Sequence, residues 1–135
     1  MMPAATKQGG TAFAMPDVCL TPAPPAPPTP VPYPNNGSLA LTDRAVAEIL
    51  IVNKETITES SQIPQSMGDE AGTNGGVTSG VNRGVVSFKQ GSSKVYAKGA
   101  RIVPLASMTA HNGSSANAPA GTLVAVSQTT VLVAP

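Results

Sequence analysis

The sequence predicts a single, mainly β domain built from short hairpins, and three observations support this. Runs rich in valine and isoleucine recur along the chain and are separated by polar turns. Glycine (13 residues) and proline (14) make up a fifth of the 135 residues, which favours turns over long helices. With 2 Phe, 2 Tyr and no Trp, the core must be thin and filled by Val, Ile and Ala. We expect one domain over residues 1–135.

The clearest β-unit spans residues 84–104. Val85, Val86 and Phe88 are good strand formers. A polar loop around Gly91 follows, and then a second strand begins at residue 95. The dipeptide Lys98-Gly99 is a turn signal before a third strand over 101–103. The unit therefore reads as strand, loop, strand, tight turn and strand.

Related β-units lie on both sides. Residues 48–57 align with 94–103, because both place a β-branched pair before a polar turn with a lysine, and an isoleucine after it. Residues 121–133 resemble 84–95 more loosely. Three similar units predict pseudo-threefold character, although strand composition alone can also produce such likeness.

Residues 15–36 contain nine of the prolines. Proline fixes φ and removes the backbone donor, and it pushes the preceding residue to extended geometry. We therefore predict neither a helix nor a central strand. The interpretation is a proline-rich extended strap over 16–36, in polyproline II conformation, along one face of the domain. A linker and a docking peptide for an SH3-type partner are the alternatives.

The remaining segments are less regular. Residues 38–50 fit either one or two helical turns or a bulged strand. Two long polar or glycine-rich loops are predicted at 60–84 and 105–120, and loops of that length are usually functional or disordered. The first contains the acidic pair Asp69-Glu70, and the second contains His111, the one histidine of the chain.

Charge, cysteine content and the character of the first residues argue against several classes of protein. The net charge is +1 and 11% of residues are charged, with no basic cluster, so we expect no nucleic-acid partner. One cysteine excludes an internal disulfide framework. The first residues lack an apolar core, so no signal peptide and no transmembrane segment are predicted, and we expect synthesis and folding in the cytoplasm.

The reactive residues allow three kinds of site. A Ser–His–Asp arrangement could use His111 and Asp69, but no nucleophile motif accompanies it. A thiol nucleophile would pair Cys19 with His111. A metal site would use Cys19 and His111 as ligands, with Asp17, Asp69 or Glu70 completing it.

A series of motifs resembles the PAAR-like (Tox-PAAR-like) family. These are PDVCLTPAP with PVPYPN, SMGDEAGTNGGVTSG, SSKVYAKGARIV and TAHNG, over about residues 6–117. The resemblance implies a small conical β-domain that caps and sharpens the blunt end of a trimeric β-helical spike, one copy per trimer, in a contractile injection apparatus such as a type VI secretion system. It implies no enzymatic activity, transient contact with a target membrane, carriage of effector toxins, and a location in the cytoplasm until export at the tip.

Two features depart from that family. We expect no C-terminal toxin extension. Relatives hold zinc near the apex with several histidines and a cysteine, whereas here Cys19 and His111 alone fall on the matching motifs, so these two are the candidate zinc ligands. The alternatives are an effector-loading adaptor that uses loops 60–84 and 105–120, and a small Cys/His hydrolase.

Overall fold

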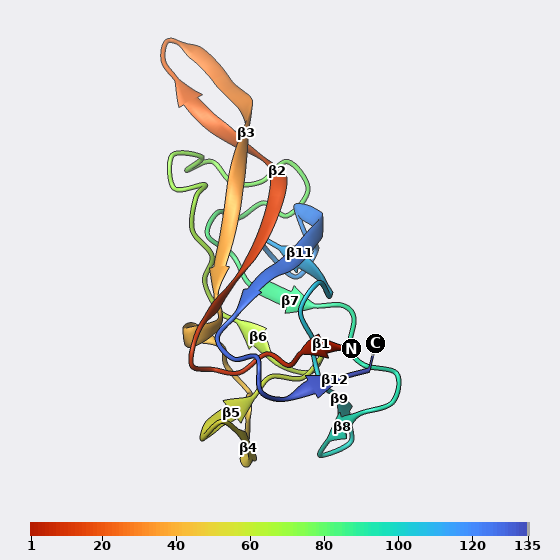
Figure 1. Cartoon of the computed structure of the whole chain (residues 1–135). Helices are drawn as coiled ribbons and strands as arrows, with labels where there is room; N and C mark the ends of the chain where they lie inside the picture. Colours follow the sequence, from red (N-terminus) through yellow and green to blue (C-terminus); the bar gives the residue numbers. More distant parts are fainter. Residues whose placement is uncertain (135) are drawn as a thin grey trace.

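The computed structural model describes residues 1–134 and confirms a mainly β chain (Figure 1). The strands are β1 (Met2–Pro3), β2 (Gly10–Ala23), β3 (Ala26–Ser38), β4 (Val46–Ile51), β5 (Lys54–Thr56), β6 (Gln62–Ile63), β7 (Val86–Phe88), β8 (Tyr96–Ala97), β9 (Ala100–Arg101), β10 (Met108–His111), β11 (Ala118–Val126) and β12 (Leu132–Val133). Among the described residues the one helical element is η1 (Leu39–Leu41), a single 3-10 turn.

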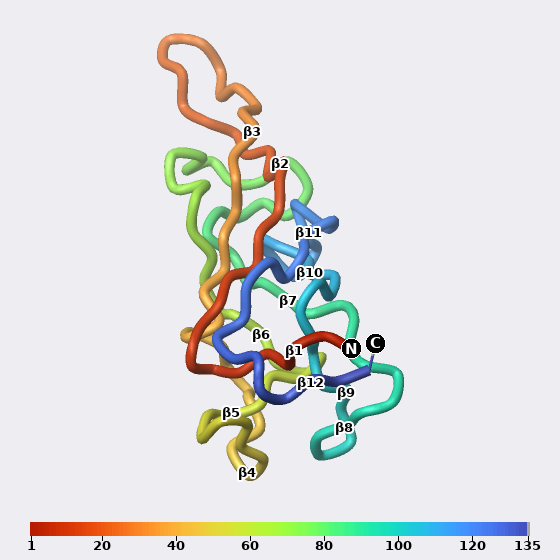
Figure 2. Tube along the Cα trace, in the orientation of Figure 1, coloured from red at the N-terminus to blue at the C-terminus, as the bar shows by residue number. Residues whose placement is uncertain are grey.

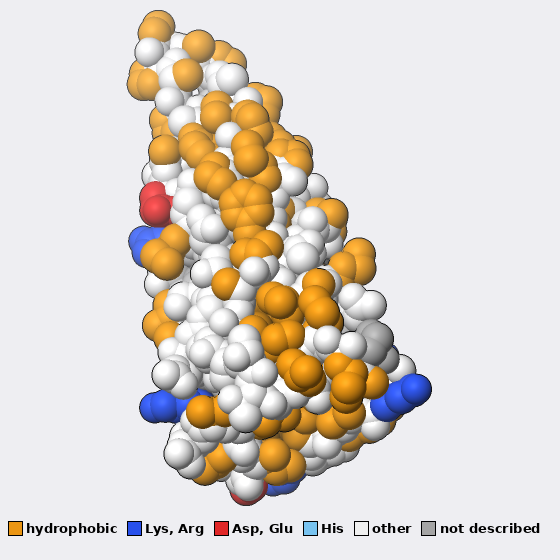
Figure 3. Space-filling model, viewed as in Figure 1, with side chains coloured by type: hydrophobic (Ala, Val, Ile, Leu, Met, Phe, Trp, Pro, Cys, Tyr) orange, Lys and Arg blue, Asp and Glu red, His pale blue; other side chains and the backbone are white. Residues whose placement is uncertain are grey.

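The molecule tapers from a broad end to a narrow one. The pairs β4–β5, β8–β9 and β1–β12 lie at the broad end, and the turn between β2 and β3 forms the narrow end (Figures 1 and 3). The first and last strands, β1 and β12, lie next to each other at the broad end (Figure 2). The tapered shape agrees with the conical domain that the family resemblance implies.

The body is a six-stranded antiparallel sheet in the order β3-β2-β11-β10-β7-β6. Its main core contains small and branched side chains, as the composition predicts: Ala5, Ala12, Leu39, Ile57, Ile63, Val86, Phe88, Val103 and Leu123. A second cluster lies at the broad end and contains Ala4, Ile51, Ala97, Ile102 and Val133. Such a core leaves little room for an internal ligand cavity.

The proline-rich segment is a β-hairpin, and the strap prediction was wrong in this respect. β2 pairs with β3 along its length, from Thr11 opposite Ser38 to Ala23 opposite Ala26. β2 also has β11 as its other neighbour, but only over Gly10–Phe13, before the first proline of the hairpin. The hairpin projects beyond the body instead of lying along a face (Figure 1).

Proline spacing explains why a hairpin is possible. Leu20 donates its N–H to the Gly75 carbonyl (2.8 Å), on the side away from β3. Pro30 lies opposite Leu20 in the ladder. In an antiparallel pair, the backbone N–H positions of two opposite residues either both face the partner strand or both face away from it. The position where Pro30 lacks an N–H therefore also faces away from β2. The prolines at 28, 30, 32 and 34 share this parity. All four therefore remove donors from the outer edge of an edge strand, where proline is tolerated.

Two irregular regions are resolved by the structure. Residues 38–50 contain η1, a single helical turn, and then β4, whose register shifts between Val46 and Leu50. Each of the two alternatives is therefore correct for part of the segment. The predicted loop 105–120 is partly wrong, because it contains β10 and the start of β11. Its polar residues Thr109 and His111 misled the prediction, since both are buried.

Candidate functional site

Three backbone segments meet at the broad end in a closed ring of hydrogen bonds. The Ala5 N–H donates to the Val103 carbonyl (2.8 Å), the Val103 N–H to the Ile57 carbonyl (3.1 Å), and the Ile57 N–H to the Ala5 carbonyl (3.2 Å). All three side chains are buried in the main core. Each segment donates to one neighbour and accepts from the other, so the ring has pseudo-threefold symmetry.

Each segment of the ring continues into a two-stranded ribbon. The ribbons are β4–β5, β8–β9 and β12–β1. Equivalent pairs next to the end of each ribbon are Ile51 with Lys54, Ala97 with Ala100, and Val133 with Met2. The first member of each pair belongs to the broad-end core cluster. The broad end therefore has three similar corners.

The corners differ in how they are closed. The turn of the first has Val52 and Asn53 at φ 50° and 61°, and that of the second has Lys98 and Gly99 at φ 50° and 81°. Positive φ at both central residues is what a two-residue hairpin of native twist requires. The third corner is formed by the first and last strands, β1 and β12, which no turn joins.

The predicted pseudo-threefold character is therefore present, with one correction. The alignment of 48–57 with 94–103 places Ile57 opposite Val103, which are the two equivalent ring positions. The third unit is not 121–133, because β12 pairs with β1 and not with β11. Gln128 helps to hold the two ends together, since its amide donates to the Ala4 carbonyl (2.8 Å).

A second cluster of functional groups lies at the root of the hairpin. Asp17, Cys19 and Asp69 are buried, and one ligand-type atom of each lies within 4.8 Å of the other two. The Cys19 Sγ is 3.6 Å from an Asp17 oxygen and 3.8 Å from an Asp69 oxygen. By donor type and spacing, this group could hold a metal ion.

Amide donors surround the two carboxyl groups. Asp17 accepts from the side-chain amides of Asn35 (2.9 Å), Asn112 (3.0 Å) and Asn117. Burial acts to raise the pKa of Asp17, but hydrogen bonds from the Asp69 carboxyl and the three amides outweigh it and lower that pKa. Burial and the neighbouring Asp17 raise the pKa of Asp69 to about 6. The lower pKa of Asp17 makes it the first of the two to ionise.

His111 lies beside this group but does not join it. Its Nδ1 is 2.7 Å from the Asn35 Oδ1, and its Nε2 is 2.8 Å from the Thr109 hydroxyl. Burial lowers the pKa of His111 to about 4, so the ring is neutral at neutral pH. Burial and the two carboxylates raise the pKa of the Cys19 thiol to about 12. Neither residue has a path to a substrate, since both are 0% exposed.

The sequence identified part of this cluster. Cys19 and two of the three acidic candidates, Asp17 and Asp69, lie together. Glu70 lies outside, with an exposed carboxylate that accepts the Gly68 N–H at 2.5 Å. The asparagines at 35, 112 and 117 were missed, because an amide in a turn sequence gives no signal that it is buried.

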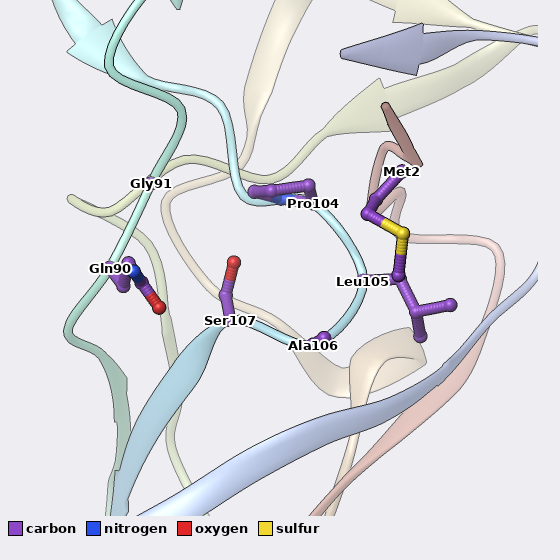
Figure 4. A pocket seen from close by; sticks show the side chains of 7 residues that line it. All are labelled: Met2, Gln90, Gly91, Pro104, Leu105, Ala106 and Ser107. Atoms are coloured by element: carbon purple, nitrogen blue, oxygen red, sulfur yellow. The ribbon is translucent and has the colours of Figure 1, made fainter. Parts of the chain in front are cut away.

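Two cavities lie elsewhere on the molecule. One, of about 150 Å³, is lined by Met2, Gln90, Gly91, Pro104, Leu105, Ala106 and Ser107 (Figure 4). The other, of about 420 Å³, lies between η1 and the first ribbon and is lined by Lys7, Ala40, Ala47, Leu50, Asn53, Lys54 and Glu55. Neither cavity is lined by a histidine or a cysteine, so Ser107, shown in Figure 4, has no histidine partner among the residues that line its cavity.

Comparison with known proteins gives one match. A family model described as Toxin PAAR-like domain matches residues 10–119. The matched region begins at β2 and ends within β11, so it includes the hairpin and the buried polar cluster but neither strand of the third ribbon. No curated protein and no solved structure matches the chain. In residues 1–134 no helix has the length and apolar character needed to span a membrane.

Proposed function

The chain belongs to the Toxin PAAR-like domain family, and from this we propose that it is a non-enzymatic tip protein. In this proposal it caps and sharpens the trimeric β-helical spike of a contractile injection apparatus of the type VI secretion kind. The broad end binds the blunt end of the spike, and the hairpin forms the point. The observation that carries the proposal is the closed ring of hydrogen bonds among Ala5, Ile57 and Val103.

The ring matters because of symmetry. A trimeric β-helix ends in three equivalent sets of unpaired strand edges, which favour further pairing. One chain with three similar ribbons offers one ribbon to each subunit, so a single copy satisfies a whole trimer. A protein without this internal symmetry would leave two of the three edges uncovered.

Exposed apolar side chains on the three ribbons support the broad end as the surface that binds the spike. Leu50 on β4, Tyr96 on β8 and Leu132 on β12 are 56%, 56% and 45% exposed, so each corner carries one. Contiguous exposed apolar surface usually marks a binding site. The lysines and arginines visible in Figure 3 lie around the broad end and about halfway up the body, and none is visible at the point.

The narrow end suits the other half of the role. No charged side chain occurs from residue 18 to residue 42, and the prolines of β3 limit the flexibility of the hairpin. A stiff, uncharged point is appropriate for transient contact with a target membrane. Folding in the cytoplasm, followed by export at the tip of the apparatus, is part of this proposal.

Effector loading is the second candidate, and the outer face of the sheet favours it. Phe13 and Met108 both lie opposite Thr122 in adjacent strand pairs, so the three share a face. Both large side chains are exposed, as are Met15 and Val124. Flexible methionines are common at surfaces that bind several partners. The hydrolase alternative is disfavoured, because its Cys19 and His111 are both inaccessible.

Binding to a purified trimeric β-helical spike protein tests the leading proposal. We expect one chain per trimer by light scattering coupled to size-exclusion chromatography. Leu50→Asp and Leu132→Asp, on two corners, should each weaken binding at least tenfold. Val77→Asp is the matched control, because Val77 is 59% exposed but lies in the glycine-rich loop away from the broad end. Three chains per trimer, or equal loss with Val77→Asp, would contradict the proposed surface.

A further inference from the structure

We propose that the hairpin of this protein is held to its body by a metal-independent polar lock. The polar lock consists of Asp17, Cys19, Asn35, Asp69, Asn112 and Asn117. It includes Cys19, one of the two residues that the family resemblance implies as zinc ligands. In this chain, amide and backbone donors bind the carboxylates that would otherwise serve as ligands.

The first argument is the direction of the donors. Asp17 receives amide N–H groups at both oxygens, with Asn112 and Asn117 on Oδ1 and Asn35 on Oδ2. Asp69 receives the backbone N–H of Arg83 at 3.0 and 3.1 Å. A backbone N–H can only donate, so its orientation is not open to choice. These donors occupy the carboxylate oxygens that would ligate a cation, and the Asn112 and Asn117 amide nitrogens also lie 3.6 and 4.0 Å from the Cys19 Sγ. Their partial positive charges therefore oppose a cation among the three ligand-type atoms.

The second argument is the position of His111. The Asn35 amide nitrogen faces Asp17, Asp69 and Ser66, so its oxygen must face the ring. The His111 Nδ1 therefore carries the proton and donates to Asn35, while Nε2 accepts from the Thr109 hydroxyl. Both ring nitrogens are occupied, and neither faces Cys19.

Close packing against β11 also restricts the His111 ring on one side. A Cβ placed on Gly121 would lie 2.6 Å from the His111 Cδ2 and 2.7 Å from its Nε2, so the β11 backbone contacts the ring directly. A buried structural zinc site in a protein is almost always built from four protein ligands. Here three ligand-type atoms are grouped, and the preferred nitrogen ligand is held apart.

The third argument concerns the thiol. Cys19 lies with its Sγ 3.6 Å from an Asp17 oxygen and 3.8 Å from an Asp69 oxygen, and it donates its S–H toward these carboxyl groups. Zinc binds the thiolate, so metal binding would require this proton to leave a site that already holds two acidic groups. The protonated thiol is instead one of the donors of the lock.

The lock joins three parts of the chain that are distant in sequence. Asp17 and Asn35 belong to the two strands of the hairpin, Asp69 to the glycine-rich loop, and Asn112 and Asn117 to the turn between β10 and β11. In the described residues no buried side-chain nitrogen or oxygen lacks a partner. A fully satisfied buried network rigidifies what it joins, and so fixes the direction of the hairpin relative to the body.

Metal content and thermal unfolding of the purified full chain test the inference. We expect less than 0.1 equivalent of zinc or other transition metal by mass spectrometry. The Tm should change by less than about 1 °C with EDTA or with added zinc. Cys19→Ser, which keeps a donor, should lower the Tm by only a few degrees. About one equivalent of metal, together with a fall in Tm on chelation, would overturn the inference.

Two further measurements test whether the hydrogen bonds of the polar lock stabilise the fold. Asn112→Ala removes donors to Asp17 and to the Val81 carbonyl and should lower the Tm by more than about 5 °C. Asn74→Ala, an exposed amide in the glycine-rich loop, is the control and should leave it unchanged. In the wild type, nitrogen NMR at pH 6.5 should find His111 neutral with the proton on Nδ1. A proton on Nε2, or a metal-shifted Nδ1, would count against the lock.

Discussion

Asp69 and His111 should make opposite contributions to the pH dependence of stability. The pKa of Asp69 is raised from 3.8 to about 6, so between these values the folded state holds a proton that the unfolded state has lost. The pKa of His111 is lowered from 6.5 to about 4, so in that interval the unfolded state holds the extra proton. Lowering the pH therefore favours folding through Asp69 and unfolding through His111.

The two effects are similar in size. At about 1.4 kcal/mol for each pKa unit, each displacement corresponds to about 3 kcal/mol over its full range. The pKa of Asp17, which faces both groups, is lowered from its ordinary value by hydrogen bonds from its neighbours that outweigh its burial, so Asp17 adds little to the change over this interval. The wild-type free energy of unfolding should therefore change by less than about 1 kcal/mol between pH 6.5 and 4.5, where the two contributions nearly cancel.

Single substitutions should expose each contribution. In Asp69→Asn the His111 effect remains alone, and the free energy of unfolding should fall by about 2 kcal/mol from pH 6.5 to 4.5. In His111→Asn the Asp69 effect remains, and the free energy should rise by about 2 kcal/mol over the same interval. Both variants will lose some stability at every pH, so the slope is the measured quantity.

The assay is urea unfolding of chelator-treated protein, followed by circular dichroism at five or more pH values. The reasoning requires slopes of opposite sign in the two variants. Three parallel profiles would refute it, because they would show that neither group is displaced from its ordinary pKa. A wild type that loses stability steadily from pH 6.5 would show that the Asp69 contribution is absent.

Three other substitutions test separate parts of the fold. Gly121→Ala places a methyl group against the His111 ring and should lower the free energy of unfolding in urea by about 1–3 kcal/mol. Gly9→Ala is the control. A methyl group added at Gly9 has no atom within 4 Å, so this variant should change the free energy of unfolding by less than about 0.5 kcal/mol. Gln128→Ala leaves the Ala4 and Val131 carbonyls without their amide donor and should lower the Tm by several degrees; an unchanged Tm would mean that the third ribbon closes without it. Pro30→Thr restores a donor on the outer edge of β3 and should promote self-association in light scattering, because that edge is then open to pairing; a strictly monomeric variant would show that proline is not what protects it.

The sequence identified the strand-forming segments well where turns are strong local signals. The hairpins around residues 53 and 98 have turn residues suited to positive φ, and both were predicted within a few residues. The alignment of 48–57 with 94–103 was informative because equivalent corners need the same alternation of buried and exposed positions. The hairpin of residues 10–38 was mistaken for a strap, because the prediction considered how many prolines the segment has. It did not consider that those of β3 occupy alternate positions.

The ring of backbone hydrogen bonds and the polar lock could not be predicted, because both join segments that are far apart in the sequence. Asn35 and His111 are 76 residues apart, and nothing local marks either as buried. Likewise the third corner joins the two ends of the chain, which no repeat search along the sequence would pair. The residues themselves determined that the chain is rich in strands and where its turns lie. They also determined that the outer edge of β3, where proline removes the donors, does not pair further. Tertiary packing decided which donors face which carboxylates and that the ends complete a threefold base, because such contacts form only after distant segments have been brought together.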